Sequence, residues 1–264
     1  MNIAVCIKQV PASESKVKPS ADGKDIDRTG LTYVVNPYDE FGLEEALRIK
    51  ERLKTGQVTV FALGPEKTAE ALRTCLAVGA DQAVHIKDPA LEGGDAYATA
   101  RALAAALKKN RYDILFFGRQ AIDDDNSAVG IHVAEMMGLP HVAAVNKLEL
   151  FPEEKRAVVH RQIEGAVEVL DVNLPALFTC QKGMNEPRYA SLPGIMKAKQ
   201  KPLTVMSIAD LGLEGSQVGL NGSKVEIEKI DLPPVRSGGK IIEGEPGQAV
   251  AELLRILKEE IKVL

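Results

Sequence analysis

Residues 113–130 read D-I-L-F-F-G-R-Q-A-I-D-D-D-N-S-A-V-G, and this stretch decides the fold class. The apolar run at 114–117 predicts a short buried strand that leads directly into Gly118 and a polar loop. A helical pattern begins at Ala128. A strand, a loop and the start of a helix are the arrangement in which open α/β sheets present backbone N–H groups to a phosphate. The three successive carboxylates at 123–125 are unusual there, because they have the same sign of charge as the anion.

The same alternation of strands and helices covers the first half of the chain. Apolar runs predict strands at 2–10, 57–63, 82–86 and 113–117. Helical periodicity predicts helices at about 38–54, 66–78, 95–109 and 128–138. Strands that alternate with helices form right-handed βαβ units. We therefore expect an α/β fold with a doubly wound, mostly parallel sheet of the adenine-nucleotide-binding type.

The pattern changes after Pro140. Period-2 alternation at 142–150, 155–163 and 166–172 predicts three strands joined by short turns, an antiparallel extension of the sheet. Residues 176–180, A-L-F-T-C, predict a buried strand that returns to the centre of the sheet.

The last fifth of the chain has a different composition. Residues 210–247 are rich in glycine and show weak periodicity, which predicts an extended arm, and an amphipathic helix is predicted at about 247–262. We therefore expect a nucleotide-binding domain at 1–209 and an arm with a terminal helix at 210–264 that docks on another surface.

Composition restricts the class of protein. The net charge of −4 and pI of about 5.7 provide no basic surface for nucleic acid. No run of 18 apolar residues predicts a membrane span. Cys6, Cys75 and Cys180 are isolated, which favours neither a disulfide framework nor a metal site and is typical of a reducing cytoplasm. We expect a cytoplasmic protein with no metal centre.

The loop at 118–130, called the nucleotide loop below, has two interpretations. Asp and Asn favour turns for local hydrogen-bonding reasons, so the loop could be a solvated turn. Its place at the carboxyl end of a parallel strand favours a ligand site. Asn126 and Ser127 could cap the following helix, and free backbone N–H groups there could hold a phosphate.

Asn36-Pro37-Tyr38-Asp39-Glu40 precedes the first long helix. Proline near the first helical position and acids in the first turn are sufficient to explain a helix start. The functional alternative is that Asn36 forms a second edge of the same ligand site.

Residues 185–199, called the docking segment below, read N-E-P-R-Y-A-S-L-P-G-I-M-K-A-K. Such a basic segment is usually a solvated helix with some core contacts. However, Leu192, Ile195 and Met196 have helical spacing and would form a compact apolar surface with a basic rim, which suits transient docking of a partner.

Motifs for catalysis are missing from the sequence. It contains no G-x-S-x-G, G-x-G-x-x-G or G-x-x-x-x-G-K-[ST]. From the residues alone we expect an adenine-nucleotide-binding α/β subunit, with no catalytic residue assigned.

Four segments together resemble the beta subunit of electron transfer flavoprotein. They are V-C-I-K-Q-V at 5–10, N-P-Y-D-E-F at 36–41, G-R-Q-A-I-D-D-D at 118–125, and the docking segment. The last two segments are long and their polar residues follow an unusual order, so a match to them is highly specific.

This resemblance implies a heterodimer. The alpha subunit holds most of a redox-active FAD, and the beta subunit borders the flavin and binds AMP, or a second FAD in electron-bifurcating members. The nucleotide-site residues carried over by position are Cys6, Asn36, Pro37, Tyr38, Asp39, Leu63, Arg119, Gln120, Ala121, Ile122, Asp123, Asp124, Asp125, Asn126, Ser127, Ala128, Val129 and Gly130.

The resemblance also implies partner dehydrogenases, for acyl-CoA or other substrates, that dock on residues 185–199. Electrons would pass from them to a quinone-linked or other acceptor. Leu192 would enter a pocket of the partner, and the arm would wrap around the alpha subunit. The docking residues carried over are Glu186, Arg188, Tyr189, Leu192, Pro193, Ile195, Met196 and Lys197.

Two departures distinguish AMP from a second FAD. The segment P-A-S-E-S at 11–15 lacks the tyrosine that ordinary members carry and is similar to the bifurcating branch. The nucleotide loop, however, has Asp124 where bifurcating members have glycine, and it lacks their threonine after Asp125. An added charge near a pyrophosphate is unfavourable, so the loop favours AMP and an electron carrier over a bifurcating NADH-oxidising enzyme. A nucleotide-binding protein of the universal-stress type is disfavoured, because it should lack the docking segment and the arm.

Overall fold

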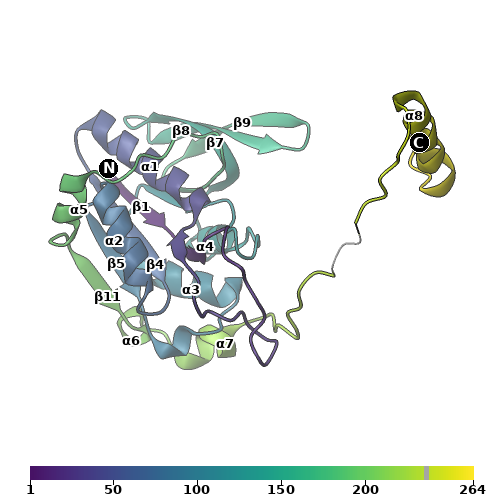
Figure 1. Cartoon of the computed structure of the whole chain (residues 1–264). Helices are drawn as coiled ribbons and strands as arrows, with labels where there is room; N and C mark the ends of the chain where they lie inside the picture. The colour runs from purple at the N-terminus through teal and green to yellow at the C-terminus, as the bar shows by residue number, and fades with distance from the viewer. Residues whose placement is uncertain (235–237) are drawn as a thin grey trace.

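The computed structural model describes residues 1–234 and 238–264. Within them, nine strands form one sheet in the order β11-β5-β4-β1-β6-β10-β7-β8-β9, shown in Figure 1. The bounds of these strands are β1 Asn2–Cys6, β4 Gln57–Leu63, β5 Gln82–Ile86, β6 Ile114–Gly118, β7 His141–Phe151, β8 Arg156–Ile163, β9 Ala166–Asn173, β10 Ala176–Cys180 and β11 Leu203–Met206.

The sheet is parallel from β11 to β7, and β8 and β9 extend it in antiparallel fashion. Four long helices follow strands of the parallel part: α1 Pro37–Leu53, α2 Thr68–Val78, α3 Ala96–Leu107 and α4 Val129–Met137. The predicted α/β class, the mostly parallel sheet and the antiparallel extension are confirmed.

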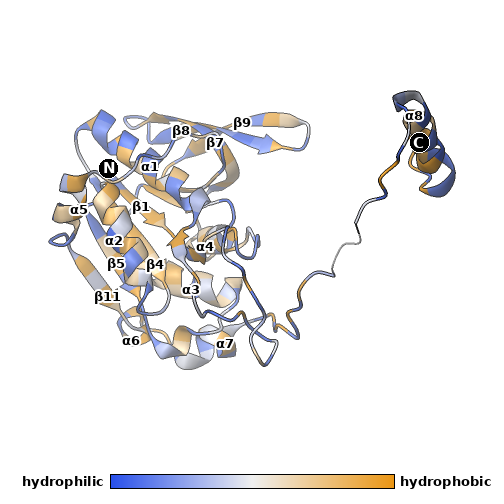
Figure 2. Ribbon diagram, viewed as in Figure 1, coloured by the Kyte–Doolittle hydropathy of each residue, from blue (hydrophilic) through white to orange (hydrophobic). Residues whose placement is uncertain are grey.

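The helices cover both faces of the sheet, as expected for a doubly wound fold. Leu43, Leu47 and Leu72 of α1 and α2 pack in one buried apolar cluster, and Leu103 and Val133 of α3 and α4 pack in a second cluster on the other face. In Figure 2 the strands and the inner sides of these helices are predominantly hydrophobic. Burial on both faces explains why the central strands read as continuous apolar runs.

The predicted strand at 2–10 is too long. β1 ends at Cys6, and Gln9–Pro11 forms a separate strand, β2, that pairs in antiparallel fashion with β3, Tyr33–Val35. The strand breaks after Cys6 because the backbone N–H of Lys8 does not donate to a neighbouring strand. It donates instead to the side chain of Asp39 (2.7 Å).

The chain beyond residue 200 packs further than predicted on the body, which is the nine-stranded sheet with the helices that cover it. β11 pairs with β5 at the sheet edge, a strand that the short and half-exposed sequence L-T-V-M did not indicate. Leu211 and Val218 are buried in the second cluster, and the N–H groups of Lys224 and Val225 donate to Asp95. The chain therefore stays in contact with the rest of the fold well beyond residue 210, the predicted start of the arm. The N–H of Ile230 still donates to the carbonyl of Gly23 (2.7 Å), and the arm starts after it.

The arm ends in helix α8, Pro246–Arg255, followed by a π-helical turn, Ile256–Glu260. In Figure 1 this helix stands away from the sheet. Residues 235–237 of the predicted arm lie outside the described residues. Among the residues that the structure describes, no helix has the length and apolar character needed to cross a membrane.

Candidate functional site at the switch point of the sheet

The topological switch point lies between β1 and β6. β1 pairs in parallel with both β4 and β6, and the strand order runs in opposite directions on either side of it. Cys6 and Leu63, two predicted site residues, end β1 and β4 at this edge. Ligands of open α/β sheets bind beyond the carboxyl ends of strands at such a point.

Asn36 holds the nucleotide loop in place. Its side-chain amide nitrogen donates to the carbonyl of Gln120 (2.8 Å), and its Oδ1 accepts the N–H of Ile122 (3.2 Å). The residue is almost completely buried. Asn36 and the loop thus form one unit, as the functional alternative required, although Asn36 also occupies the N-cap position of α1.

Asp39 joins three segments. Its carboxylate accepts the N–H of Lys8 after β1 (2.7 Å) and the N–H of Gly118 at the end of β6 (2.8 Å), while its backbone belongs to α1. Only glycine suits position 118, because an added Cβ would lie 2.3 Å from Asp39 Oδ1 and 2.8 Å from Tyr38 Cβ. Burial raises the pKa of Asp39 to about 7, against the opposing effect of these N–H donors.

Lys8 offsets part of the negative charge of the three carboxylates. Its ammonium group lies 2.8 Å from Asp123 and 3.1 Å from Asp124. Asp125 instead accepts from the side-chain amide of Gln120 (2.5 Å). Burial acts to lower the pKa of Lys8, but the two carboxylates raise it above its ordinary value, so Lys8 stays charged. One positive charge is thus shared between Asp123 and Asp124, which reduces but does not remove the electrostatic argument against a longer dinucleotide.

The backbone of the loop is irregular next to α4. Asp125 and Ser127 have positive φ values of 50° and 58°, a conformation that non-glycine residues seldom adopt and that is common at ligand sites. Successive N–H groups in such a turn form a concave anion site. The expected capping of α4 by Asn126 or Ser127 is wrong: Ala128 is the N-cap, and among the described residues no side chain caps this helix. The N–H groups of its first turn are thereby left available.

The remaining loop residues divide between two environments. Gly130 lets α4 approach the sheet, since an added Cβ would lie 3.1 Å from Thr179 and 3.2 Å from Phe117. Arg119 and Ser127 face an open hollow beside β7 and β8 that Arg161 and Gln181 also line.

Ala121 and Pro37 contribute through the backbone. The carbonyl of Ala121 accepts the N–H of Asp125, and Pro37 begins α1. Within residues 1–234 and 238–264, no three His, Cys, Asp or Glu side chains gather as a metal site would require.

Lys8 and Gly118 belong to this unit in the structure but not to the predicted set of site residues. Both lie in motifs that carried the resemblance, and Lys8 follows β1 by two residues. A lysine beside the carboxyl end of the first parallel strand is the signal that could have identified it.

The docking segment contains a short helix, α5, Leu192–Ala198, capped by Ser191. Tyr189, Leu192 and Met196 are 96, 79 and 74% exposed. Ile195 is also exposed, as are Glu186, Pro193 and Lys197. The predicted apolar surface therefore exists, on the first turns of α5.

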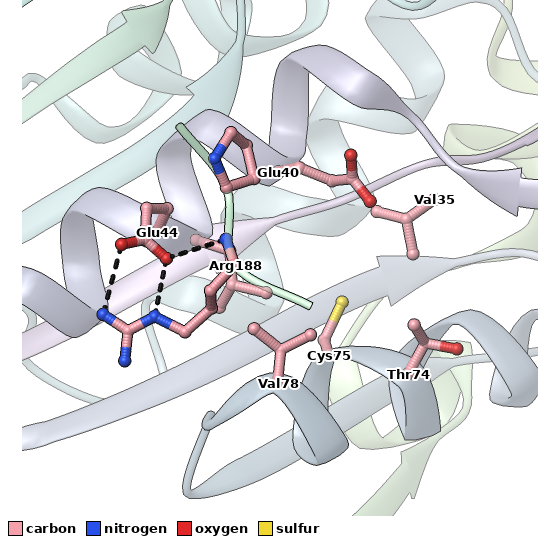
Figure 3. A pocket seen from close by; sticks show the side chains of 9 residues that line it. Val35, Glu40, Glu44, Thr74, Cys75, Val78 and Arg188 are labelled. Carbon is pink, nitrogen blue, oxygen red and sulfur yellow. Dashed lines mark hydrogen bonds and ion pairs between the residues drawn. The ribbon is translucent and has the colours of Figure 1, made fainter. Parts of the chain in front are cut away.

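Arg188 differs from its neighbours because its guanidinium faces α1. It contacts Glu44 (2.8 Å) and Glu51 (2.5 Å) of that helix. Figure 3 shows Arg188 against Glu44 beside a hollow of only about 20 Å³, room for roughly one water molecule.

Comparison with known proteins identifies the family of this chain. A family model described as the electron transfer flavoprotein domain matches residues 24–211. The chain belongs to the electron transfer flavoprotein family. Electron transfer flavoprotein subunit beta of Methylophilus methylotrophus is 39% identical over 98% of each chain, and that of Bacillus subtilis is 37% identical over the whole of both chains.

One relative has a different name. Caffeyl-CoA reductase-Etf complex subunit CarD of Acetobacterium woodii is 41% identical over 98% of this chain and 99% of its own. These relatives extend over the arm as well as the body, whereas the family model ends at residue 211. The chain is thus an electron transfer flavoprotein beta subunit along its whole length.

Proposed function

We propose that this electron transfer flavoprotein subunit binds AMP at the switch point and pairs with an alpha subunit. It then borders an FAD that the alpha subunit holds and passes electrons from dehydrogenases to a further acceptor. The single observation that supports this best is the unit formed by Lys8, Asn36, Asp39 and the nucleotide loop.

The residues at this site suit a nucleoside monophosphate such as AMP. The positive-φ turn at Asp125 and Ser127 and the first turn of α4 offer backbone N–H donors to one phosphate. Lys8 offsets part of the charge of the adjacent carboxylates, and the half-buried Leu63 at the end of β4, beside the buried Cys6, offers apolar surface to an adenine ring. A flavin, when bound at the subunit boundary, supplies the one- and two-electron chemistry. The role of this chain is to hold and orient.

A bifurcating subunit with a second FAD is the alternative. The segment at 11–15 and the partial compensation of the Asp124 charge by Lys8 favour it. The side chain of Asp124, present where that branch has glycine, favours AMP.

Nucleotide counting separates these two functions. The chain is co-expressed with its alpha subunit, and the nucleotides released from the denatured complex are quantified by chromatography and absorbance. One FAD and one AMP per heterodimer are expected. Two FAD and no AMP would refute the AMP assignment and support the bifurcating alternative.

The docking role of α5 makes a separate prediction. Leu192→Ala removes the most protruding apolar side chain of the helix and should raise the KM for a purified acyl-CoA dehydrogenase roughly tenfold, as the loss of an interface anchor does. Leu220 of α7, Gly219–Gly222, is 66% exposed, and Leu220→Ala is the control that should leave the KM unchanged. Equal KM values for wild type and Leu192→Ala would contradict docking through α5.

A further inference from the structure

The docking segment is fixed to α1 at its first end. Asn185 donates from its side-chain nitrogen to the carbonyl of Phe41 (3.0 Å) and to Glu45 (3.1 Å). Arg48 donates to the carbonyl of Glu186 (3.3 Å). Backbone and side-chain groups of the segment therefore meet successive turns of one helix.

Arg188 makes the strongest of these contacts. Nε and Nη2 donate to the two oxygens of Glu44 (2.8 and 3.1 Å), Nη1 and Nη2 donate to Glu51 (2.5 and 3.0 Å), and the backbone N–H also reaches Glu44 (3.3 Å). Such bidentate, charge-assisted pairs are strong and define orientation. The Glu44 side chain is only 3% exposed, so it faces Arg188 and Arg48 and cannot reach a docked protein.

The other end of the segment is fixed to α2. Arg73 donates to the carbonyls of Ala198 and Lys201 (2.7 and 2.9 Å), and Lys201 Nζ donates to the carbonyls of Leu76 and Ala80 (2.9 and 2.6 Å). Between the two anchors, Leu192 and the rest of the apolar surface project from the body.

We propose that Arg188 is a positioning residue: by pairing with Glu44 and Glu51 it holds the docking segment on α1 in the orientation that presents Leu192 and Met196, and it is not itself a contact for the partner. This assignment rests on the proposed docking function and replaces the docking role predicted for Arg188 from sequence. A variant that lacks Arg188 should still keep α1 stable, because Arg48 pairs with Glu44 (2.6 Å).

Amide hydrogen exchange of the heterodimer, with no partner present, tests the anchoring. Arg188→Ala and Glu44→Gln should each speed exchange of amides in 189–198 by about tenfold, as expected for loss of an ordering contact. Arg156→Ala is the matched control: Arg156 also pairs with two carboxylates, Glu154 and Asp171, but on the antiparallel extension. Unchanged amide exchange rates of residues 189–198 in both Arg188→Ala and Glu44→Gln would overturn the proposal.

Kinetics with a purified acyl-CoA dehydrogenase tests the consequence. Arg188→Ala should raise the partner KM about tenfold and leave kcat within about twofold, because only the docking geometry is lost. Glu44→Gln, which retains Arg188, should also raise KM, and the double variant should be no worse than Arg188→Ala alone. Arg188→Lys should restore little, since an ammonium group cannot bridge both carboxylates bidentately.

The outcomes separate this inference from the proposed function. If Arg188 contacted the partner directly, Arg188→Ala would raise KM while Glu44→Gln and Glu51→Gln would not, and the positioning role would be wrong. If Leu192→Ala left KM unchanged, docking through α5 would fail, whereas accelerated exchange in Arg188→Ala would still establish the anchor.

Discussion

Asp39 illustrates at the scale of one residue how a buried carboxylate organises the switch point. It accepts N–H groups from Lys8, which follows β1, and from Gly118, which ends β6, and it lies in the first turn of α1. Its almost complete burial outweighs these donors and raises its pKa to about 7. Burial, followed by the charge of Asp39, raises the pKa of the neighbouring Cys6 thiol well above its ordinary value, so Cys6 stays neutral.

Asp39 makes stability dependent on pH. Its pKa is near 3.9 in the unfolded chain and about 7 in the folded one, so the folded state binds more protons between about pH 4 and 7. The stability that this group contributes is present below about pH 4 and is lost as pH rises through 7, by at most about 1.4 kcal/mol per pKa unit. Asp39→Asn should remove this part of the decline.

Melting temperatures of the heterodimer from pH 5 to 8 measure the effect. Asp171→Asn, which changes an exposed carboxylate of β9, is the control. A difference between wild type and Asp39→Asn that stays constant across this range would contradict the titration of Asp39.

At the scale of elements, α1 supports two functions with different parts of its surface. Its first turn holds the nucleotide loop through Asn36 and Asp39, and its middle turns hold the docking segment through Glu44. α5 in turn lies close against α2. This contact requires glycine at position 194, because a larger side chain would not fit there. The exposed helix is therefore placed by its two neighbours and not by its own seven residues, which are too few for a stable isolated helix.

Gly194→Ala tests the placement of α5. An added Cβ would lie 2.3 Å from the carbonyl oxygen of Ala77, so α5 must move away from α2. We expect a loss of about 1–3 kcal/mol in the free energy of unfolding, typical of overpacking, and a higher partner KM. Chemical denaturation and electron-transfer kinetics measure the two effects. Gly215→Ala is the control, because nothing lies within 4 Å of a Cβ there, and equal behaviour of both variants would refute the argument.

At the scale of the whole molecule, the body and the arm differ in how they bury apolar surface. The body has two clusters, one on each face of the sheet. The arm exposes large apolar side chains along its length, which is typical of a segment that binds another chain. These exposed residues are Leu232, Ile241, Val250, Leu253, Leu254, Ile261, Val263 and Leu264.

Truncation of the chain before α8 tests the roles of the body and the arm separately. A chain that ends at Ile242 lacks α8 but keeps every residue of the two core clusters, because the buried Ile256 that it also loses lies in neither cluster. Its circular dichroism spectrum should match that of the full chain after correction for one helix, and its co-purification with the alpha subunit should fall at least about tenfold, because the lost apolar area drives association. Full recovery of the heterodimer without α8 would contradict a docking role for the arm.

The sequence alone determined most of the order of strands and helices up to residue 180, the parallel sheet and its antiparallel extension. These depend on local periodicity: the mainly apolar runs of 57–63, 82–86 and 176–180 coincide with β4, β5 and β10 because burial on both faces favours apolar side chains at most positions of these strands. The exposed apolar positions of α5 were likewise readable from helical spacing.

Only the tertiary structure decided which polar groups meet. Lys8 and Asp123 are 115 residues apart, Asn36 and Gln120 are 84 apart, and Arg188 and Glu44 are 144 apart. No local pattern encodes such pairs. The sequence therefore left Asn36 open between a helix start and an edge of the ligand site, assigned Arg188 to partner docking by resemblance, and gave no sign that Lys8 pairs with the carboxylates. The packing of α1 between the nucleotide loop and the docking segment brings these groups together, and burial then requires each of them to find a partner.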